Sequence, residues 1–285
     1  MRIYFLIMLL AAMCTTACNT LKNMDSTLNN QQLLAVDTAA TLGHRYIVMK
    51  PKAGTEVLTQ SGTAPDVNDG SLLLSVAAAF TGDDLTTVCG DHVVAGTLHK
   101  GYADVTTTGH MLIVDGKVKI LPSDIIDQSI KSATAHRGYL FQQCYIVENG
   151  VAHVDRIPQA IIDRRPHIIF RAAVLMADGS FAVVQAADEQ YPEEFVAGIV
   201  KLGARDALYL DMGTWAYGWY RTMAGGTTTE LAKRYDNTRF QSNWLIIRAK
   251  NDYRRVSYLF GEEAKKLYLC TALKFPCDGK LRQYT

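Results

Sequence analysis

Short apolar runs separated by turn dipeptides constrain this chain more than any other feature of its sequence. Asp115-Gly116, Asn149-Gly150 and Asp178-Gly179 each lie between two such runs, and each dipeptide can adopt the positive φ angles of a tight hairpin. Two strands joined by so short a turn pair antiparallel. We expect strands in a largely antiparallel or mixed sheet at residues 46–49, 72–80, 111–114, 139–147, 168–175, 181–184, 207–210 and 244–247.

Two further segments have helical patterns. Residues 193–202 follow Pro192, begin with two acids, carry one apolar face and stop at Gly203, as a capped helix does. Residues 262–269 predict a second helix. The chain has 285 residues, of which 48% are hydrophobic, and shows no repeat or interdomain linker. We therefore predict the α+β class, with one domain over residues 33–285 whose sheet core is flanked by helices.

The N-terminal segment predicts an exported chain. Arg2 is followed by an apolar run over residues 3–13 that is too short to cross a bilayer, and small residues then precede Cys18. The sequence Thr15-Thr16-Ala17-Cys18 is typical of a relaxed lipobox, in which the cysteine receives the lipid. We expect residues 1–17 to be a lipoprotein signal peptide. An ordinary secretory leader without lipid is the alternative.

This N-terminal pattern also predicts a location and its partners. The polar residues 18–32 are expected to form a flexible tether between the lipidated Cys18 and the domain, so that the protein is lipid-anchored to the cell envelope and meets the membrane only there. A disulfide is chemically permitted outside the cytoplasm, and Cys270 with Cys277 is the candidate pair; buried thiols are the alternative. The net charge of +1 gives no field that would attract nucleic acid.

Asp211 is the first candidate for chemistry. It directly follows a predicted buried strand and opens a polar, glycine-containing turn. Loops at strand ends often present reactive groups, but an aspartate in such a turn is more often a capping residue. The residue type and its position therefore do not decide its role by themselves.

Three segments, taken in order, resemble the phosphodiester glycosidase family. A predicted helix ending in Leu202-Gly203 leads to Leu210-Asp211-Met212-Gly213-Thr214, which is similar to the Leu-Asp-Gly-Gly signature of that family. Phe170-Arg171-Ala172-Ala173 resembles its Arg-Thr-Ala strand, and Ser242-Asn243-Trp244-Leu245-Ile246 resembles its closing Asn-x-Leu strand. The resemblance covers most of residues 70–250 and is carried by order and spacing more than by identity.

The sequence also departs from that family's pattern. Residues 76–80 resemble an early family strand, but Ala78 and Ala79 stand where an asparagine is usual, so one polar side chain is missing. Met212 replaces a glycine, and Trp215 replaces a small residue. These departures keep two other readings open: a catalytically degenerate envelope lipoprotein that binds a glycan or phosphate, and an envelope protein that serves protein contacts.

The resemblance implies a hydrolase that cleaves a sugar-1-phosphate linkage in a phosphorylated glycan or glycoconjugate, without a cofactor. Arg171 would bind two phosphate oxygens through its planar fork. Asp211 would act at the anomeric carbon. Further substrate-binding residues would be Gly213, Thr214, Trp215, Asn243 and Glu189.

A second acid or base is left open by the sequence. Glu189, Asp188, His110 and His153 are all candidates, and a phosphate leaving group reduces the need for a strong acid. No cysteine or histidine spacing matches a zinc site, so no metal is expected. A weak divalent-cation site at Asp83-Asp84 or Asp188-Glu189 is the alternative to solvated loops there.

Overall fold

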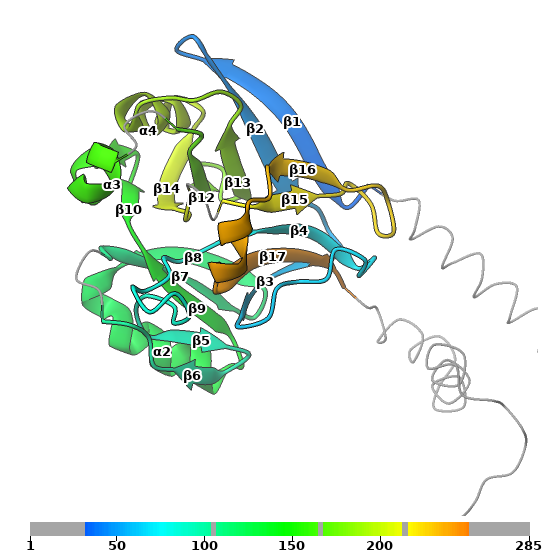
Figure 1. The fold of residues 1–285 in the computed structure, drawn as a ribbon, viewed down its shortest axis with the longest axis vertical. Helices are drawn as coiled ribbons and strands as arrows, with labels where there is room; N and C mark the ends of the chain where they lie inside the picture. The colour runs from blue at the N-terminus through cyan, green and yellow to red at the C-terminus, as the bar shows by residue number, and fades with distance from the viewer. Residues whose placement is uncertain (1–31, 104–106, 165–167, 213–215, 251–285) are drawn as a thin grey trace, which may run out of the picture. The chain divides into compact units, whose positions relative to one another are not determined.

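The computed structural model describes residues 32–250, except 104–106, 165–167 and 213–215 (Figure 1). The described residues up to Ala249 belong to one compact unit. The predicted leader, the Cys18 lipidation site, the predicted helix over 262–269 and the cysteine pair Cys270 and Cys277 all lie outside the described residues.

Three antiparallel sheets make up most of this unit. The seven-stranded first sheet has the order β1 (Leu34–Thr41), β2 (His44–Pro51), β13 (Phe181–Ala186), β12 (Arg171–Met176), β14 (Ala204–Tyr209), β10 (Tyr145–Glu148), β11 (Val151–Ala152). The five-stranded second sheet has the order β16 (Thr229–Ala232), β15 (Gly218–Tyr220), β4 (Leu72–Ala77), β17 (Asn243–Ala249), β3 (Thr55–Ser61). The five-stranded third sheet has the order β6 (Thr97–His99), β5 (His92–Val94), β9 (Tyr139–Gln143), β7 (Gly109–Val114), β8 (Lys117–Pro122).

Helices are short and few among the described residues. They are the α-helices α2 (Ile126–Ala135), α3 (Gln159–Arg164) and α4 (Pro192–Lys201) and the 3-10 turns η1 (Ser123–Ile125), η2 (Val154–Arg156) and η3 (Asp236–Phe240). The α4 helix confirms the helix expected after Pro192. The fold is therefore richer in strand than the predicted α+β class implies, although it is compatible with that class.

The hairpin predictions are confirmed. Asp115-Gly116 joins β7 to β8 and Asn149-Gly150 joins β10 to β11, with positive φ at both residues of each turn. Asp178-Gly179 joins β12 to β13, and there only the glycine has positive φ. Leu42-Gly43 and Ala95-Gly96 form turns of the same kind. Sequence reasoning missed these two because leucine and alanine are disfavoured at a left-handed position.

The apolar run at 139–147 is two strands rather than the single strand expected. β9 pairs with β7 in the third sheet, whereas β10 pairs with β14 in the first sheet. The change of sheet occurs at Cys144, whose backbone N–H donates to the Gln143 side-chain oxygen at 2.8 Å. Periodicity alone cannot locate such a crossing, because both strands are buried and both read as apolar.

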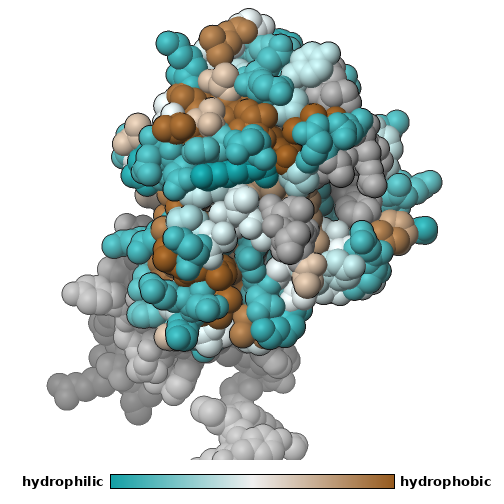
Figure 2. Space-filling model, turned by 90° about the vertical axis from the view of Figure 1, so that its left-hand side faces the viewer, coloured by the Kyte–Doolittle hydropathy of each residue, from teal (hydrophilic) through white to brown (hydrophobic). Residues whose placement is uncertain are grey.

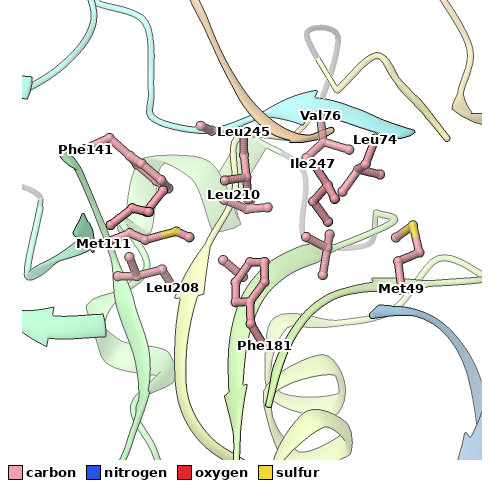
Figure 3. Close-up of a cluster of buried hydrophobic side chains, with 14 of the residues drawn as sticks. Met49, Leu74, Val76, Met111, Phe141, Phe181, Leu208, Leu210, Leu245 and Ile247 are labelled. Atoms are coloured by element: carbon pink, nitrogen blue, oxygen red, sulfur yellow. The ribbon is translucent and has the colours of Figure 1, made fainter. Parts of the chain in front are cut away.

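The main core lies where the three sheets face one another. In Figure 3 side chains from all three sheets converge, including Leu208 of β14, Leu245 of β17 and Met111 of β7. A second cluster covers the other face of the first sheet, where Phe195 of α4 packs over strands that include Val174 of β12. The first sheet is thus buried on both faces, which is why its central strands are nearly continuous apolar runs.

The surface carries both hydrophilic and hydrophobic regions. On the face shown in Figure 2, hydrophilic side chains cover much of the described surface and hydrophobic ones gather in separate patches. Leu42, Val151, Tyr191 and Tyr235 are each at least half exposed. Within the described ranges, no helix combines the length and the apolar composition needed to cross a membrane.

We predict that His110 makes the fold acid-sensitive. This histidine on β7 is buried against α2, where its Nε2 lies 2.7 Å from Ser129 Oγ, and burial lowers its pKa from 6.5 to about 4. The unfolded chain therefore binds a proton before the folded one does as pH falls from 6.5 to 4. The associated loss of unfolding free energy is about 3 kcal/mol.

Urea unfolding of the parent and of His110→Gln at pH 7 and pH 4.5 measures this effect. The variant should lose less stability on acidification than the parent, while the exposed control His136→Gln should behave as the parent does. An equal loss of unfolding free energy on acidification in the parent and in His110→Gln would contradict the prediction.

Candidate functional site at the junction of the three sheets

Strand ends from all three sheets meet just beyond β4. The Ala78 carbonyl accepts a hydrogen bond from the backbone N–H of Asp211, which follows β14, at 3.0 Å. The same carbonyl accepts from Gln143, the last residue of β9, at 3.4 Å. Ala79 is held by Asn243, the first residue of β17. The backbone at Asp211 is thereby hydrogen-bonded to the residue that follows β4 of the second sheet. The shared Ala78 carbonyl also brings it close to Gln143 of the third sheet.

Asn243 binds the protein's own backbone. Its Oδ1 accepts from the Ala79 N–H at 2.7 Å, and its Nδ2 donates to the Ala79 carbonyl at 3.0 Å. The backbone ladder between β4 and β17 ends at the pair Ala77 and Trp244, so this side chain continues the pairing where the ladder stops. Asn243 is buried and both ends of its amide are engaged, so in this structure its side chain positions the backbone of Ala79.

Arg171, the first residue of β12, is fully buried. Its Nε and Nη2 donate to Gln185 Oε1 at 2.8 and 2.6 Å, and Nη2 also donates to the Ala216 carbonyl at 3.2 Å. Nη1 has no hydrogen-bond partner among the described residues. The Nη1 nitrogen, with its two N–H groups, is therefore the part of the Arg171 guanidinium that the described residues leave unsatisfied.

The backbone of β15 approaches this unsatisfied nitrogen closely. A Cβ atom on Gly218 would stand 3.3 Å from Arg171 Nη1 and 2.8 Å from a Val76 methyl group. Glycine at this position therefore lets β15 pack tightly against Val76 and the guanidinium, where the Cβ atom of any other residue would clash.

The Asp211 carboxyl is buried beside the Arg171 charge. Burial raises the pKa of Asp211 to about 8, while a hydrogen bond from the Met212 backbone and the charge of Arg171 oppose the rise. Burial also lowers the pKa of Arg171 to about 9. At neutral pH the carboxyl holds its proton and the guanidinium keeps its charge, so the site offers an acid and a cation together.

Two buried residues of this site escaped the sequence analysis. Tyr209 precedes Asp211 by two positions. Burial is the main cause that raises the pKa of Tyr209, and the nearby Asp211 charge raises it further. Its ring packs against Phe80, with 5.8 Å between centroids. Gln185 pairs in register with Arg171 across β12 and β13. An amide at the end of an apolar strand was the available signal for Gln185, and alternation with Asp211 was the signal for Tyr209.

The acidic candidates after β13 lie on a more exposed loop. Glu189 is exposed. Asp188 Oδ2 lies 3.7 Å from His44 Nδ1 at the start of β2. The predicted substrate-binding residues Gly213, Thr214 and Trp215 lie outside the described residues.

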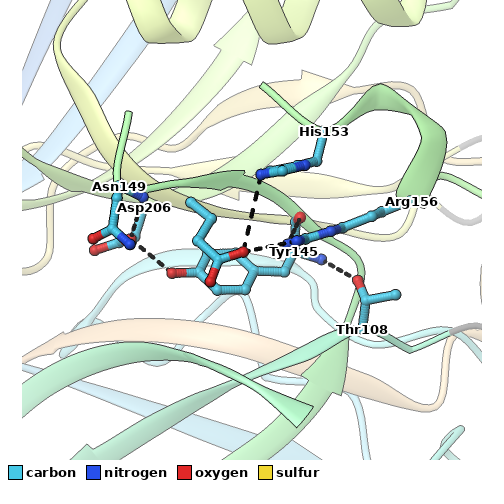
Figure 4. Close-up of polar contacts among 7 residues, drawn as sticks. Thr108, Tyr145, Asn149, His153, Arg156 and Asp206 are labelled. Atoms are coloured by element: carbon cyan, nitrogen blue, oxygen red, sulfur yellow. Dashed lines mark hydrogen bonds and ion pairs between the residues drawn. The ribbon is translucent and has the colours of Figure 1, made fainter. Parts of the chain in front are cut away.

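The two histidine candidates make their contacts elsewhere. His110 faces Ser129 of α2. His153 Nε2 lies 3.9 Å from a Glu148 oxygen that also accepts from Arg156 at 2.7 Å, at the network around Tyr145 in Figure 4. That network holds β10 against β14 and the η2 turn.

Carboxylate, imidazole and thiol groups do not gather into a metal-binding set within the part of the chain that the structure describes.

The comparisons with known proteins show a fold. No protein-family model matches the sequence, and no curated protein matches it. The catalytic domain of zebrafish N-acetylglucosamine-1-phosphodiester α-N-acetylglucosaminidase, auto-inhibited by its pro-peptide, aligns over 78% of this chain and 85% of that one, with TM-score 0.53 and 12% identity. A hypothetical protein from Synechocystis aligns over 76% of this chain and 62% of that one, with TM-score 0.44 and 11% identity. The chain thus has a fold distantly similar to that of a phosphodiester glycosidase.

We predict that Asn243→Ala destabilises the protein by about 2–4 kcal/mol, because it leaves the buried Ala79 N–H and carbonyl without partners. Urea unfolding at pH 7 measures the change. The matched control is Asn237→Ala in the exposed η3 turn, which should shift stability by less than about 0.5 kcal/mol. Equal effects of the two substitutions would show that the Ala79 clamp is not needed.

We also predict that Asp211→Asn becomes more stabilising as pH rises. The folded parent keeps the Asp211 proton up to about pH 8, whereas the unfolded chain releases it near pH 4, so the parent loses stability between these values. Asparagine cannot ionise. The difference in unfolding free energy should move in favour of the variant by roughly 2–5 kcal/mol from pH 4 to pH 8. The exposed control Asp37→Asn should show no such trend, and a flat difference for Asp211→Asn would refute the prediction.

Proposed function

We propose that this protein is a hydrolase that cleaves a glycosidic phosphodiester, a sugar-1-phosphate linkage, in a phosphorylated glycan or glycoconjugate. The observation that carries the proposal is the buried Asp211 acid beside the Arg171 cation, held where the three sheets meet. The fold similarity to the zebrafish phosphodiester glycosidase domain supports it. In the same proposal the protein is exported and lipid-anchored at Cys18, and it acts outside the cytoplasm.

Arg171 serves the phosphate in this scheme. Its Nη1 lacks a partner in the described structure, and a phosphate oxygen supplies the charged acceptor that a buried guanidinium requires. Gln185 and Ala216 hold the other nitrogens, so the free donor is fixed in direction before the substrate arrives. Such a preorganised donor in a low-dielectric site is the kind that stabilises developing charge best.

Asp211 acts as the acid at the bond between the anomeric carbon and the phosphate oxygen. Its proton goes to the phosphate oxygen as that oxygen leaves the anomeric carbon, and the positive charge on the sugar ring is met by the new carboxylate. A water molecule then gives its hydroxyl to the anomeric carbon, and the proton it releases restores the acid. The products are a free sugar and a phosphomonoester, so atoms and charges balance.

The direct test is release of free sugar from a panel of sugar-1-phosphodiesters that includes N-acetylglucosamine-1-phosphate esters. We expect turnover by the full chain that falls at least about 100-fold in Asp211→Asn, since the acid is lost while the shape is kept. The control Asp37→Asn should retain parental turnover. Activity should also decline as pH rises through about 8, where Asp211 loses its proton.

Arg171→Lys tests the anion site separately. Lysine keeps the charge but has no Nη1 aimed beside Gly218, so weaker binding of the phosphodiester is expected while the fold is retained. Absence of turnover across the whole panel, together with saturable binding of a phosphorylated glycan, would contradict the hydrolase proposal and favour a degenerate binding protein.

A further inference from the structure

Cationic and aromatic side chains gather on one segment beside the candidate site. Residues 233–240 contain three Lys or Arg residues and one Asp. Lys233 Nζ lies 5.8 Å from the Tyr235 ring centroid, and the Arg239 guanidinium lies 4.8 Å from the Phe240 ring centroid. The Arg234 guanidinium lies 5.7 Å from the ring centroid of Tyr217. We name these six residues the basic-aromatic patch.

These contacts are concentrated in one place. Three of them involve a single segment of eight residues and one neighbouring tyrosine. Lys233, Arg234 and Arg239 are exposed, and Tyr235 is 52% exposed. The three cations and the Tyr235 ring are therefore accessible to a ligand, whereas Tyr217 also packs against a buried cluster that includes Trp219 and Trp244.

Two chains of contacts connect the patch to the candidate site. Gln185, which holds Arg171, donates from Nε2 to the Leu231 carbonyl in β16 at 2.8 Å, two residues before Lys233. Arg171 itself donates to the carbonyl of Ala216, the residue before Tyr217. The patch thus continues the chain from Ala216, which accepts a hydrogen bond from Arg171, and from Leu231, which accepts one from Gln185. In Figure 1 the η3 turn of the patch, drawn in orange, leads from β16 into β17.

We propose that the basic-aromatic patch binds the polymer chain of an anionic glycan that extends beyond the bond cleaved in the site. A guanidinium stacked on a ring still has its edge donors available for phosphate oxygens, and an exposed ring offers a face to the apolar side of a sugar. Glu230 near Tyr217 and Asp236 in η3 reduce the local charge, which favours a glycan with spaced phosphates over a densely charged polyanion.

The inference deepens the proposed function and names its substrate class, a glycan whose sugars are joined by repeated phosphodiester bonds. The probe is a hexose polymer linked through 1-phosphodiesters, with neutral dextran of equal length and a single-stranded oligonucleotide as comparisons. Binding is measured on the full chain carrying Asp211→Asn, so that the polymer survives and affinity is read separately from hydrolysis.

We expect the phosphate-linked polymer to bind in preference to dextran and to the oligonucleotide. Lys233→Gln with Arg234→Gln should weaken polymer binding at least about 10-fold at low salt, with a smaller loss at high salt because charge is screened. The matched control, Lys117→Gln with Lys119→Gln on β8, removes the same charge from the third sheet and should change the affinity less than about two-fold.

The outcomes separate the two proposals. Patch-dependent polymer binding without any sugar release by the parent would uphold this inference and reject the hydrolase. Sugar release with unchanged polymer affinity in the folded patch variant, an equal loss in the β8 control, or tighter binding of the oligonucleotide would each overturn the inference.

Discussion

The structure depends on the hydrogen bonds that gather around Ala78 and Ala79. The main chain leaves β4 there, and its polar groups need partners because the region is buried. The Asp211 N–H and the Gln143 amide approach the Ala78 carbonyl, and the Asn243 amide takes both polar groups of Ala79. These bonds join the three sheets at one place and give the carboxyl and guanidinium of the candidate site a rigid frame.

A buried charge explains much of what surrounds that frame. Arg171 lies inside an apolar sheet, where an unpaired cation is costly, and Gln185 and the Ala216 carbonyl offset part of that cost. Asp211 is buried too, but burial raises its pKa and so favours the uncharged, protonated carboxyl. The hydrogen-bonding groups of Arg171 and Asp211 are thus only partly paired. A phosphate oxygen that accepts a hydrogen bond from Arg171 Nη1 would supply the missing partner.

The candidate site could be predicted from the sequence only in part. Arg171 and Asp211 were identified because the short motifs that contain them resemble those of the phosphodiester glycosidase family, and the structure brings them together. Asn243 was found for the same reason, but its amide holds the backbone of Ala79. Tyr209 and Gln185 were missed, since a tyrosine or a glutamine in an apolar strand has no signature until its neighbour across the sheet is known.

The sequence by itself determined the local structure. Glycine-containing turn dipeptides require hairpins because few residues tolerate positive φ, and an apolar face with a proline start and a glycine stop makes a helix. Tertiary structure alone decided where the strands divide among three sheets, as at Cys144 between β9 and β10. It also decided which buried polar groups meet, because the free energy of a buried charge or amide depends on partners that are distant in sequence and close in space.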